Sequence, residues 1–249
     1  MKTLLLRLCP LLAVALFTAL STTPARAQDA PADGIRLRSL AFVIGIDVPE
    51  KVYAFGIQGE QSAGIPLNVK TFLNHEADLV PANMRKFVLT TDSDTSSVNV
   101  PEKLVAQVTL PQGLQSAILL FVPGSGQQGE PPFRVLAIDD SRKAFPAGSI
   151  KVLNMAPTEV MFELEKEKFL FKPGQTQLIK EVPFNEAGLT GMRAFCRIAE
   201  GNAASSWKRI ASSQWAPPGK KRVFQVLFLD PRSKEVQLRG FTDIAEIVR

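Results

Sequence analysis

Short runs of β-branched and aromatic residues, separated by clusters of Gly, Pro, Asn and Asp, extend from Ile35 almost to the end of the 249-residue chain. This pattern is typical of strands joined by turns, and apolar residues at helical spacing are almost absent. The sequence therefore predicts an all-β fold, with strands at 35–46, 51–57, 65–73, 86–92, 103–110, 115–122, 133–139, 149–155, 159–165, 168–172, 176–182, 192–199, 205–214, 222–229 and 236–242.

The number of expected strands predicts two domains. About seven strands in roughly 100 residues make one immunoglobulin-like β-sandwich, and the chain is long enough for two tandem copies. We expect sandwich domains at 35–141 and 149–249, joined by a short linker at 142–148. Pro146 and Gly148 punctuate this linker, and Phe145 can pack across the boundary, so we expect the two domains to touch.

Matches between the halves favour an internal duplication over two unrelated sandwiches of similar composition. Each match alone is at the level of chance, but their common order along both halves is typical of a tandem repeat. Duplication predicts that Phe87 and Phe195 point into equivalent cores. The matched positions are 84–87 with 192–195, 118–123 with 225–231, and Asp140 with Asp243.

The N-terminal 27 residues predict export. Lys2 and Arg7 accompany an apolar run, and the sequence Ala-Arg-Ala at 25–27 fits the cleavage site of a secretory signal peptide. No stretch of the chain approaches the ~20 apolar residues that a transmembrane helix needs. We expect residues 1–27 to be removed, residues 28–34 to form a flexible N-terminus, and the protein to be periplasmic or extracellular, with no transmembrane segment.

Removal of the signal peptide changes the charge balance. Lys2, Arg7 and Arg26 are three of the 29 basic residues, so 26 basic residues face 24 acidic ones in the rest of the chain. Apart from Lys-Lys-Arg at 220–222, the bases are scattered. We interpret this triplet as the solvated start of a strand rather than a phosphate or lipid contact. Without a basic face interleaved with aromatic residues, no nucleic-acid partner is expected.

One cysteine and one histidine remain in the exported chain, which argues against several chemistries. The alternation in 192–199 places Cys196 opposite Arg193 and Arg197, so we expect a buried, unreactive thiol. His75 lies in a polar connection and is interpreted as a surface side chain. The residues favour neither a Ser-His or Cys-His nucleophile nor a zinc or copper site, and no catalytic residue or metal is expected.

The segment GSGQQG at 124–129 has the spacing of a dinucleotide-binding loop. Such a loop must open a helix whose N-terminus holds the pyrophosphate. Glu130-Pro131-Pro132 and another expected strand follow instead. We interpret the segment as a hairpin loop whose glycines provide positive φ, and no cofactor is expected.

A polar loop carries the one candidate calcium pattern. Asp92, Asp94 and Ser96 alternate as oxygen ligands often do, but Ser97 and Lys103 stand where an EF-hand loop has Gly and Glu. We favour an ordinary loop between strands, and a weak calcium site near Asp92 and Asp94 is the alternative.

Trp207 and Trp215 are the candidate ligand contacts. Their even spacing places both on one face of an unbroken strand, where they could stack on sugar rings. Tryptophans of small sandwiches more often fill the core, and we favour this environment for at least one of the two.

Two pairs of carboxylates are candidates for glycan hydrolysis. Asp139 and Asp140 are adjacent, so they point to opposite faces of a strand, which is poor geometry for a cooperating acid and base. Glu163 and Glu165 share a face, but the charged residues that follow them indicate a solvated hairpin tip.

The segment 138–157 resembles a recurring segment of uncharacterised secreted bacterial β-sandwich proteins, in which Asp-Asp-Ser is followed by Phe-Pro-x-Gly-Ser and a strand that ends in Asn. The resemblance implies an exported β-sandwich protein and no particular activity. It is carried by Asp139, Asp140, Ser141, Phe145, Pro146, Gly148, Ser149 and Asn154.

These features favour an exported, non-enzymatic envelope or extracellular protein that binds or scaffolds through the loops and faces of its sandwiches. The expected partner is an envelope protein or a glycan. The alternative is a secreted carboxylate-dependent glycan hydrolase or a carbohydrate-binding protein.

Overall fold

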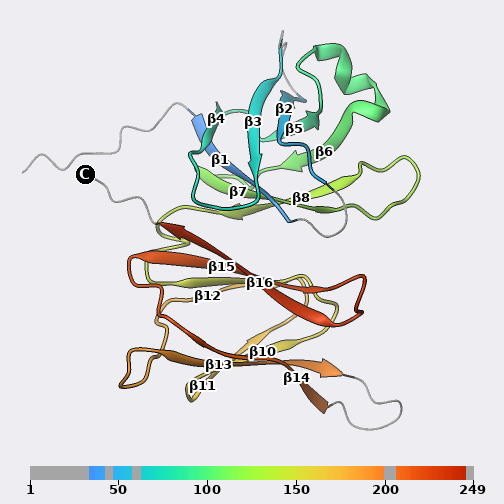
Figure 1. The fold of residues 1–249 in the computed structure, drawn as a ribbon. Coiled ribbons are helices and arrows are strands. Elements are labelled where there is room, and N and C mark those ends of the chain that lie inside the picture. The colour runs from blue at the N-terminus through green and yellow to red at the C-terminus, as the bar shows by residue number, and fades with distance from the viewer. Residues whose placement is uncertain (1–33, 43–46, 58–62, 199–205, 245–249) are drawn as a thin grey trace, which may run out of the picture. The chain divides into compact units, whose positions relative to one another are not determined.

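The computed structural model describes residues 34–42, 47–57, 63–198 and 206–244. All of these described residues belong to one compact unit. The expected signal peptide and, apart from Gly34, the expected flexible N-terminus lie outside the described residues. The described residues form sixteen strands and two short 3-10 helices, which confirms the all-β fold class (Figure 1).

The first half of the fold holds eight strands and both helices. They are β1 (Gly34–Ala41), β2 (Lys51–Gly56), β3 (Ile65–Lys70), β4 (Asp78–Pro81), β5 (Lys86–Thr90), η1 (Thr95–Asn99), η2 (Pro101–Lys103), β6 (Leu104–Thr109), β7 (Ser116–Pro123) and β8 (Phe133–Asp139). Strands β4-β1-β7-β8 and β3-β2-β5-β6 pair in these orders, and a short parallel pairing of β1 with β3 joins the two sets into one eight-stranded sheet.

The second half of the fold also holds eight strands. They are β9 (Ile150–Asn154), β10 (Val160–Leu164), β11 (Glu167–Phe171), β12 (Thr176–Ile179), β13 (Thr190–Ile198), β14 (Ser206–Trp215), β15 (Lys221–Leu229) and β16 (Val236–Ile244). They form two separate four-stranded sheets with the orders β12-β9-β15-β16 and β11-β10-β13-β14.

Strand pairing follows a common scheme in the two halves. When β1 to β8 are matched in order with β9 to β16, each pairing of the second half has a counterpart of the same sense in the first. Parallel β9–β15 matches parallel β1–β7, and β1–β3 is the one described pairing without a counterpart. The antiparallel matches are β1–β4 with β9–β12, β2–β3 with β10–β11, β2–β5 with β10–β13, β5–β6 with β13–β14, and β7–β8 with β15–β16.

Every expected strand overlaps an observed one, and among the described strands β4 is the one that the sequence did not predict. Its four residues end at Pro81 and pair only with β1 at the edge of the sheet. A strand this short has too few side chains to display an alternating pattern, and proline, which cannot donate to a ladder, is confined to such edges. The sequence pattern therefore indicated only a polar connection there.

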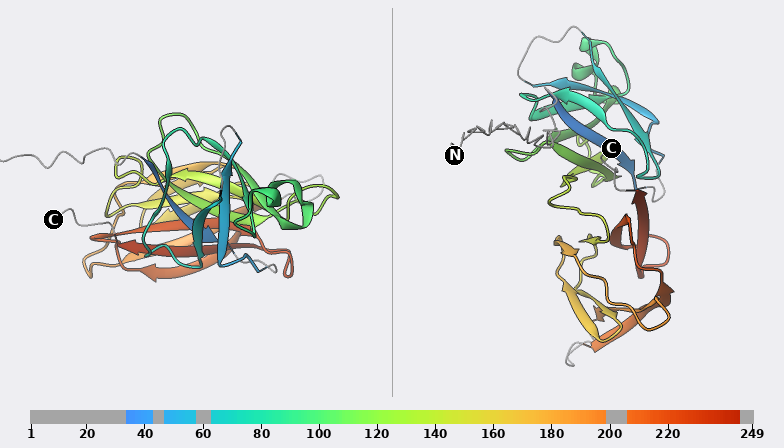
Figure 2. Two further views of the ribbon diagram at one scale, coloured as in Figure 1. Left: turned by 90° about the horizontal axis from the view of Figure 1, so that it is seen from above. Right: turned by 90° about the vertical axis from the view of Figure 1, so that its left-hand side faces the viewer.

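Three apolar clusters fill the spaces between four layers of strands (Figures 1 and 2). One cluster lies within the first half and a second lies between the two sheets of the second half. The third combines residues of β1 and β7 with residues of β9, β15 and β16. Strand β7 contributes Ala117 and Leu119 to the first cluster and Ile118 and Leu120 to the third. Its nearly unbroken apolar run thus reflects burial on both faces.

The connection at 142–148 contributes to the third cluster. The Phe145 side chain is only 1% exposed and packs with residues of both halves, as its place in the sequence predicted. The nearby polar residues Ser149 and Asn154 are also buried. Ser149 donates to the carbonyl of Pro146 at 2.6 Å, and the Asn154 amide donates to the carbonyls of Thr158 and Phe171 at 2.9 and 3.0 Å.

The expected equivalence of Phe87 and Phe195 is wrong. Phe87 is fully buried in the first cluster, whereas Phe195 is half-buried on the face of β13 opposite Met192 and Ala194. Met84 precedes β5 and Met192 lies inside β13, so the two Met-Arg-x-Phe segments sit differently with respect to the pleat. Because successive side chains alternate between faces, a different placement moves the phenylalanine from core to surface.

The segment GSGQQG lies in the loop of the antiparallel β7–β8 hairpin, between Pro123 and Phe133. Gly126 and Gly129 have φ values of 75° and 86°. The loop therefore has the hairpin context expected from the sequence rather than the strand-to-helix turn of a dinucleotide site. In the described part of the chain, none of the helices has the length and apolar character that crossing a bilayer demands.

Candidate functional site

Four buried charged side chains meet where the two halves touch. Arg38 of β1 donates two hydrogen bonds to the carboxylate of Asp140, both 2.8 Å long, and one of 2.9 Å to Asp243 at the end of β16. Arg222 of β15 donates to Asp243 at 2.7 Å and lies 3.0 Å from Asp140. Each carboxylate thus contacts both guanidinium groups, and we call these four residues the Arg–Asp network.

The donors of this network also reach backbone carbonyls. Arg38 donates to the carbonyl of Leu73 at 2.8 Å, and Arg222 donates to that of Phe145 at 2.9 Å. Burial by itself lowers the pKa of Arg38, but the hydrogen bonds from its side chain to Asp243 and Asp140 outweigh this effect and raise its pKa. The network therefore acts as a structural connection between the halves, with its charges already neutralised within the protein.

Arg222 corrects the interpretation of Lys-Lys-Arg at 220–222 as a solvated start of a strand. Lys220 and Lys221 are exposed, but Arg222 is buried and its guanidinium lies 4.6 Å from the ring centroid of Phe145. The Arg222 side chain points inward from β15 and contacts Asp140 and Asp243. No local pattern around the triplet indicates this inward position.

The candidate carboxylate pairs each have structural partners. Asp140 belongs to the Arg–Asp network, whereas Asp139 is exposed and accepts a hydrogen bond from the backbone of Ser141 at 2.9 Å. Glu163 forms an ion pair of 2.6 Å with Arg193. Glu165 lies in the β10–β11 turn, as expected, and accepts the amide of Gly191. Neither pair converges on a shared reaction site.

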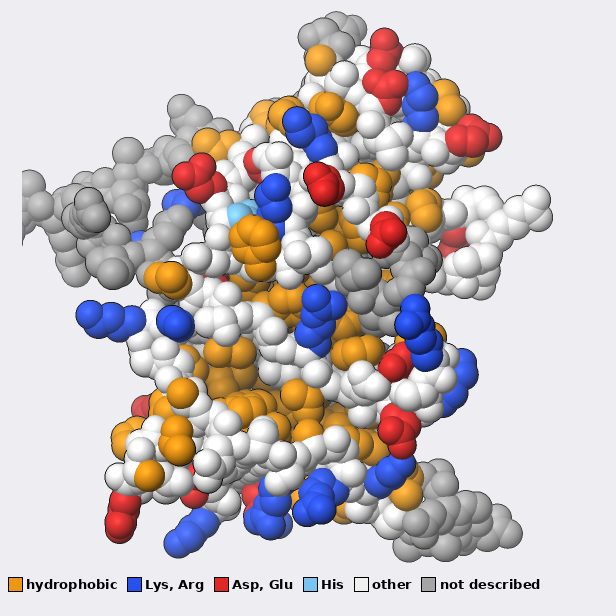
Figure 3. Space-filling model, in the orientation of Figure 1, with side chains coloured by type: hydrophobic (Ala, Val, Ile, Leu, Met, Phe, Trp, Pro, Cys, Tyr) orange, Lys and Arg blue, Asp and Glu red, His pale blue; other side chains and the backbone are white. Residues whose placement is uncertain are grey.

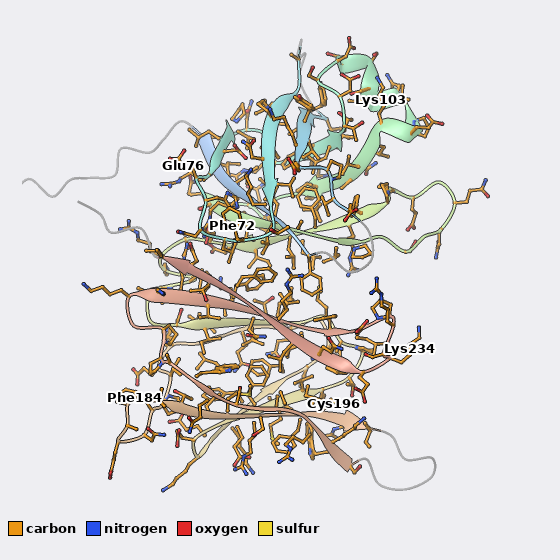
Figure 4. The ribbon with its side chains drawn as sticks, viewed as in Figure 1. Phe72, Glu76, Lys103, Phe184, Cys196 and Lys234 are labelled. Atoms are coloured by element: carbon orange, nitrogen blue, oxygen red, sulfur yellow. The ribbon has the colours of Figure 1, made fainter. Side chains whose placement is uncertain are left out.

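Cys196 is buried, as the alternation of β13 predicted (Figure 4). Its side chain packs in the cluster between the two sheets of the second half. Burial raises the pKa of the thiol, which disfavours the reactive thiolate.

His75 is half-buried rather than fully at the surface. Its ring packs edge-on against Phe72, with centroids 5.9 Å apart, and its Nδ1 lies 2.9 Å from the carbonyl of Glu76. Burial lowers the pKa of this imidazole, which favours the neutral ring.

The candidate calcium ligands support a local helix turn. Asp94 caps η1 by accepting the amide of Ser96 at 2.8 Å, and the Lys103 ammonium lies 2.6 Å from the Asp92 carboxylate. These two hydrogen bonds lower the pKa of Asp94 and of Asp92 respectively. Among the residues that the structure describes, no three His, Cys, Asp or Glu side chains form a group suited to a metal ion.

Trp207 and Trp215 lie on opposite faces of β14. Trp215 pairs with buried Thr190 and packs in the core, with its ring centroid 5.9 Å from that of Phe162. Trp207 pairs with Arg197 on the outer face and is 37% exposed. The expectation of one shared face is wrong because β14 carries an extra residue at Ile210, where the register shifts.

The outer face around Trp207 carries alternating aromatic and arginine side chains. Phe195 and Arg197 of β13 pair directly with Arg209 and Trp207 of β14, so two aromatic rings and two arginines occupy the corners of a square. The Arg197 guanidinium lies 5.0 Å from the Trp207 ring centroid, and Arg209 is exposed. We call Phe195, Arg197, Trp207 and Arg209 the Arg–aromatic patch.

An apolar row extends the Arg–aromatic patch across the sheet. Phe195 pairs with Met161 of β10, which pairs with Leu170 of β11, and Leu170 is exposed. In Figure 3, Lys and Arg side chains gather at the end of the compact unit where β13 and β14 lie. This outer face thus joins a strip of apolar surface to flanking positive charge.

The sequence pattern indicated only part of the Arg–aromatic patch and of the Arg–Asp network. The alternation in 192–199 had already separated Phe195 and Arg197 from Cys196, but the cross-strand neighbours Trp207 and Arg209 depend on a register that includes the bulge. For the Arg–Asp network, the two aspartates at matching strand ends were the available signal. Arg38 carried none, because it alternates with apolar residues in the same way as Arg36, which is exposed.

No protein family model and no curated protein matches the chain. One solved structure similar to the chain is the crystal structure of a "putative cell adhesion protein from Bacteroides uniformis". The two are 8% identical, and the match covers 87% of this chain and 98% of that chain with a TM-score of 0.19. A TM-score this low establishes neither a common fold nor a common function.

Proposed function

We propose that the chain is an exported, non-enzymatic binding protein of two tandem immunoglobulin-like sandwiches, and that it holds an envelope or extracellular partner through the Arg–aromatic patch. The exported location is supported by the signal-peptide features of residues 1–27 and by the resemblance of segment 138–157 to secreted bacterial proteins. The domains in this proposal are residues 35–141 and 149–249.

The tandem arrangement is supported by the pairing scheme that the halves have in common. In the parallel pair β1–β7, Leu37 pairs with Ala117, and in the parallel pair β9–β15, Ile150 pairs with Val223. The next residues of β1 and β9 are the buried cations Arg38 and Lys151, which therefore occupy matching positions. Asp140 and Asp243 also match at the ends of β8 and β16. An internal duplication accounts for this recurrence in two halves of different sequence.

A binding role is supported above all by the Arg–aromatic patch. Aromatic and arginine side chains are the residue types most enriched at energetically important contacts. Here they lie on a rigid sheet face whose backbone is held by the β13–β14 ladder. The carboxylates considered for hydrolysis are engaged in separate structural contacts, which favours binding over catalysis.

The test is retention of the exported full-length protein on immobilised envelope fractions. We expect the wild type to be retained and the double variant Trp207→Ala/Arg209→Ala to be retained at least about tenfold less, since each contact at such a site contributes on the order of 1–2 kcal/mol. The matched control is Phe184→Ala/Lys220→Ala, because Phe184 is 66% exposed (Figure 4) and Lys220 is also exposed, and neither residue belongs to the patch.

An equal loss of retention in the two double variants would show that retention depends on the general hydrophobicity and charge of the surface and not on the patch. A patch variant that is retained like the wild type would remove the patch from the binding surface. Circular dichroism and thermal unfolding of all three proteins establish that the variants are folded.

A further inference from the structure

We infer that the Arg–aromatic patch binds an anionic polysaccharide, whose carboxylate or sulfate groups contact Arg209 while the apolar face of a sugar ring stacks on Trp207. This inference rests on the proposed binding role of the patch and adds the chemical class of the ligand.

The sheet that carries the patch holds more basic than acidic residues on its strands. Strands β10, β11, β13 and β14 together contain five Lys or Arg residues and two Glu residues. Three of these cations are already paired: Arg193 with Glu163 at 2.6 Å, Arg197 with Glu159 at 2.8 Å, and Lys208 with Glu235 at 2.9 Å. Glu167 lies beside the β10–β11 turn, away from the patch. In the part of the chain that the structure describes, no ion pair engages the exposed Arg209, so its charge is available to an anion.

Beside Arg209, the indole ring of Trp207 provides a planar, partly exposed surface. The Arg197 guanidinium stacks on the Trp207 ring. A cation beside an aromatic ring places a charged contact next to a flat apolar one, so a ligand that has both an anionic group and a flat face can use both. Direct cross-strand partners are about 5 Å apart, and alternate residues of one strand are about 6.6 Å apart. The aromatic rings and arginines of the patch are therefore separated by distances similar to those between consecutive sugar units of a polysaccharide.

The shape of the surface favours a glycan over a single-stranded nucleic acid. Nonspecific nucleic-acid sites combine a positive groove with several aromatic platforms for successive bases. The patch instead lies on an open sheet face with one indole and one half-buried phenyl ring. A glycan needs one stacking ring and nearby charge, and apolar Met161 and Leu170 fit the C–H faces of the next sugars.

The experiment measures binding of the exported full-length protein to polygalacturonate, dextran sulfate, neutral dextran and single-stranded oligothymidine. We expect binding to the two anionic polysaccharides, weakening as salt screens the charges, and little binding to neutral dextran. Trp207→Ala should weaken binding about tenfold, as expected for loss of one stacking contact. Arg209→Glu should weaken it more than Arg209→Lys, because the latter keeps the charge.

The control Lys220→Ala/Lys221→Ala removes two exposed charges outside the patch and should change binding less than Arg209→Glu alone. Equal losses would identify nonspecific attraction to the whole protein and overturn the inference. Tighter binding to oligothymidine, or binding to neutral dextran that matches the anionic glycans, would also overturn it. If no glycan binds while envelope retention still depends on Trp207, the binding role stands and the ligand class is wrong.

Discussion

The Arg–Asp network makes the stability of the fold depend on single buried residues. Removal of one partner leaves an uncompensated charge that has been withdrawn from water, which costs roughly 3–5 kcal/mol. We expect Arg38→Met to lose this much unfolding free energy in urea denaturation, because Asp140 and Asp243 would then have only Arg222 between them.

The control for this prediction is Arg193→Met. The side chain of Arg193 is half exposed in its ion pair with Glu163, so its loss should cost no more than about 1 kcal/mol. Similar costs for the two substitutions would contradict the structural role of the network.

Lys151 should make the free energy of unfolding increase with pH in the alkaline range. Burial lowers its pKa from 10.5 to about 8. Between these values the unfolded chain binds more protons than the folded one, so the free energy of unfolding rises with pH. We expect the wild type to gain up to about 3 kcal/mol relative to Lys151→Met across this interval.

Urea unfolding of both proteins at several pH values checks this prediction. The comparison with Lys151→Met cancels the titration of other groups that the two proteins have in common. Parallel stability curves would show that Lys151 is charged and solvated in the folded state.

The reactivity of the Cys196 thiol reports on the burial of the inner face of β13. Because burial raises the pKa of the thiol and the side chain is 4% exposed, we expect labelling by a thiol reagent only after denaturation. Mass spectrometry of native and denatured samples measures this difference, and rapid labelling of the native protein would contradict the packing of Cys196 between the two sheets of the second half.

At the scale of elements, the β7–β8 hairpin loop depends on its glycine backbone. Gly126 has φ of 75°, and no atom lies near the position that a Cβ would take, so only backbone conformation opposes a larger residue. We expect Gly126→Ala to cost about 1 kcal/mol of unfolding free energy.

Gly124→Ala in the same loop should cost more. A Cβ at Gly124 would lie 2.6 Å from the carbonyl oxygen of Pro131, a contact that requires the backbone to shift. Thermal unfolding of both variants gives the comparison, and the reverse order would indicate that the loop rearranges freely.

At the scale of the whole molecule, the third apolar cluster should make the two halves unfold together. The cluster and the Arg–Asp network both combine residues of the two halves. We expect a single calorimetric transition for the wild type, with equal calorimetric and van't Hoff enthalpies. Phe145→Ala should lower the unfolding free energy by about 3–5 kcal/mol, because it opens a cavity at this boundary. Two separate transitions in the wild type would contradict the coupling.

The sequence by itself determined the all-β class, nearly all strand positions, the burial of Cys196 and the hairpin context of GSGQQG. These features depend on local alternation and turn residues, which act over a few positions. Only the tertiary structure decided the burial of Arg38 and Arg222, the pairing of Phe195 with Arg209 and the separation of Trp207 from Trp215. Each depends on a partner distant in sequence or on a bulge of one residue, and a shift of one residue moves side chains to the opposite face of a strand.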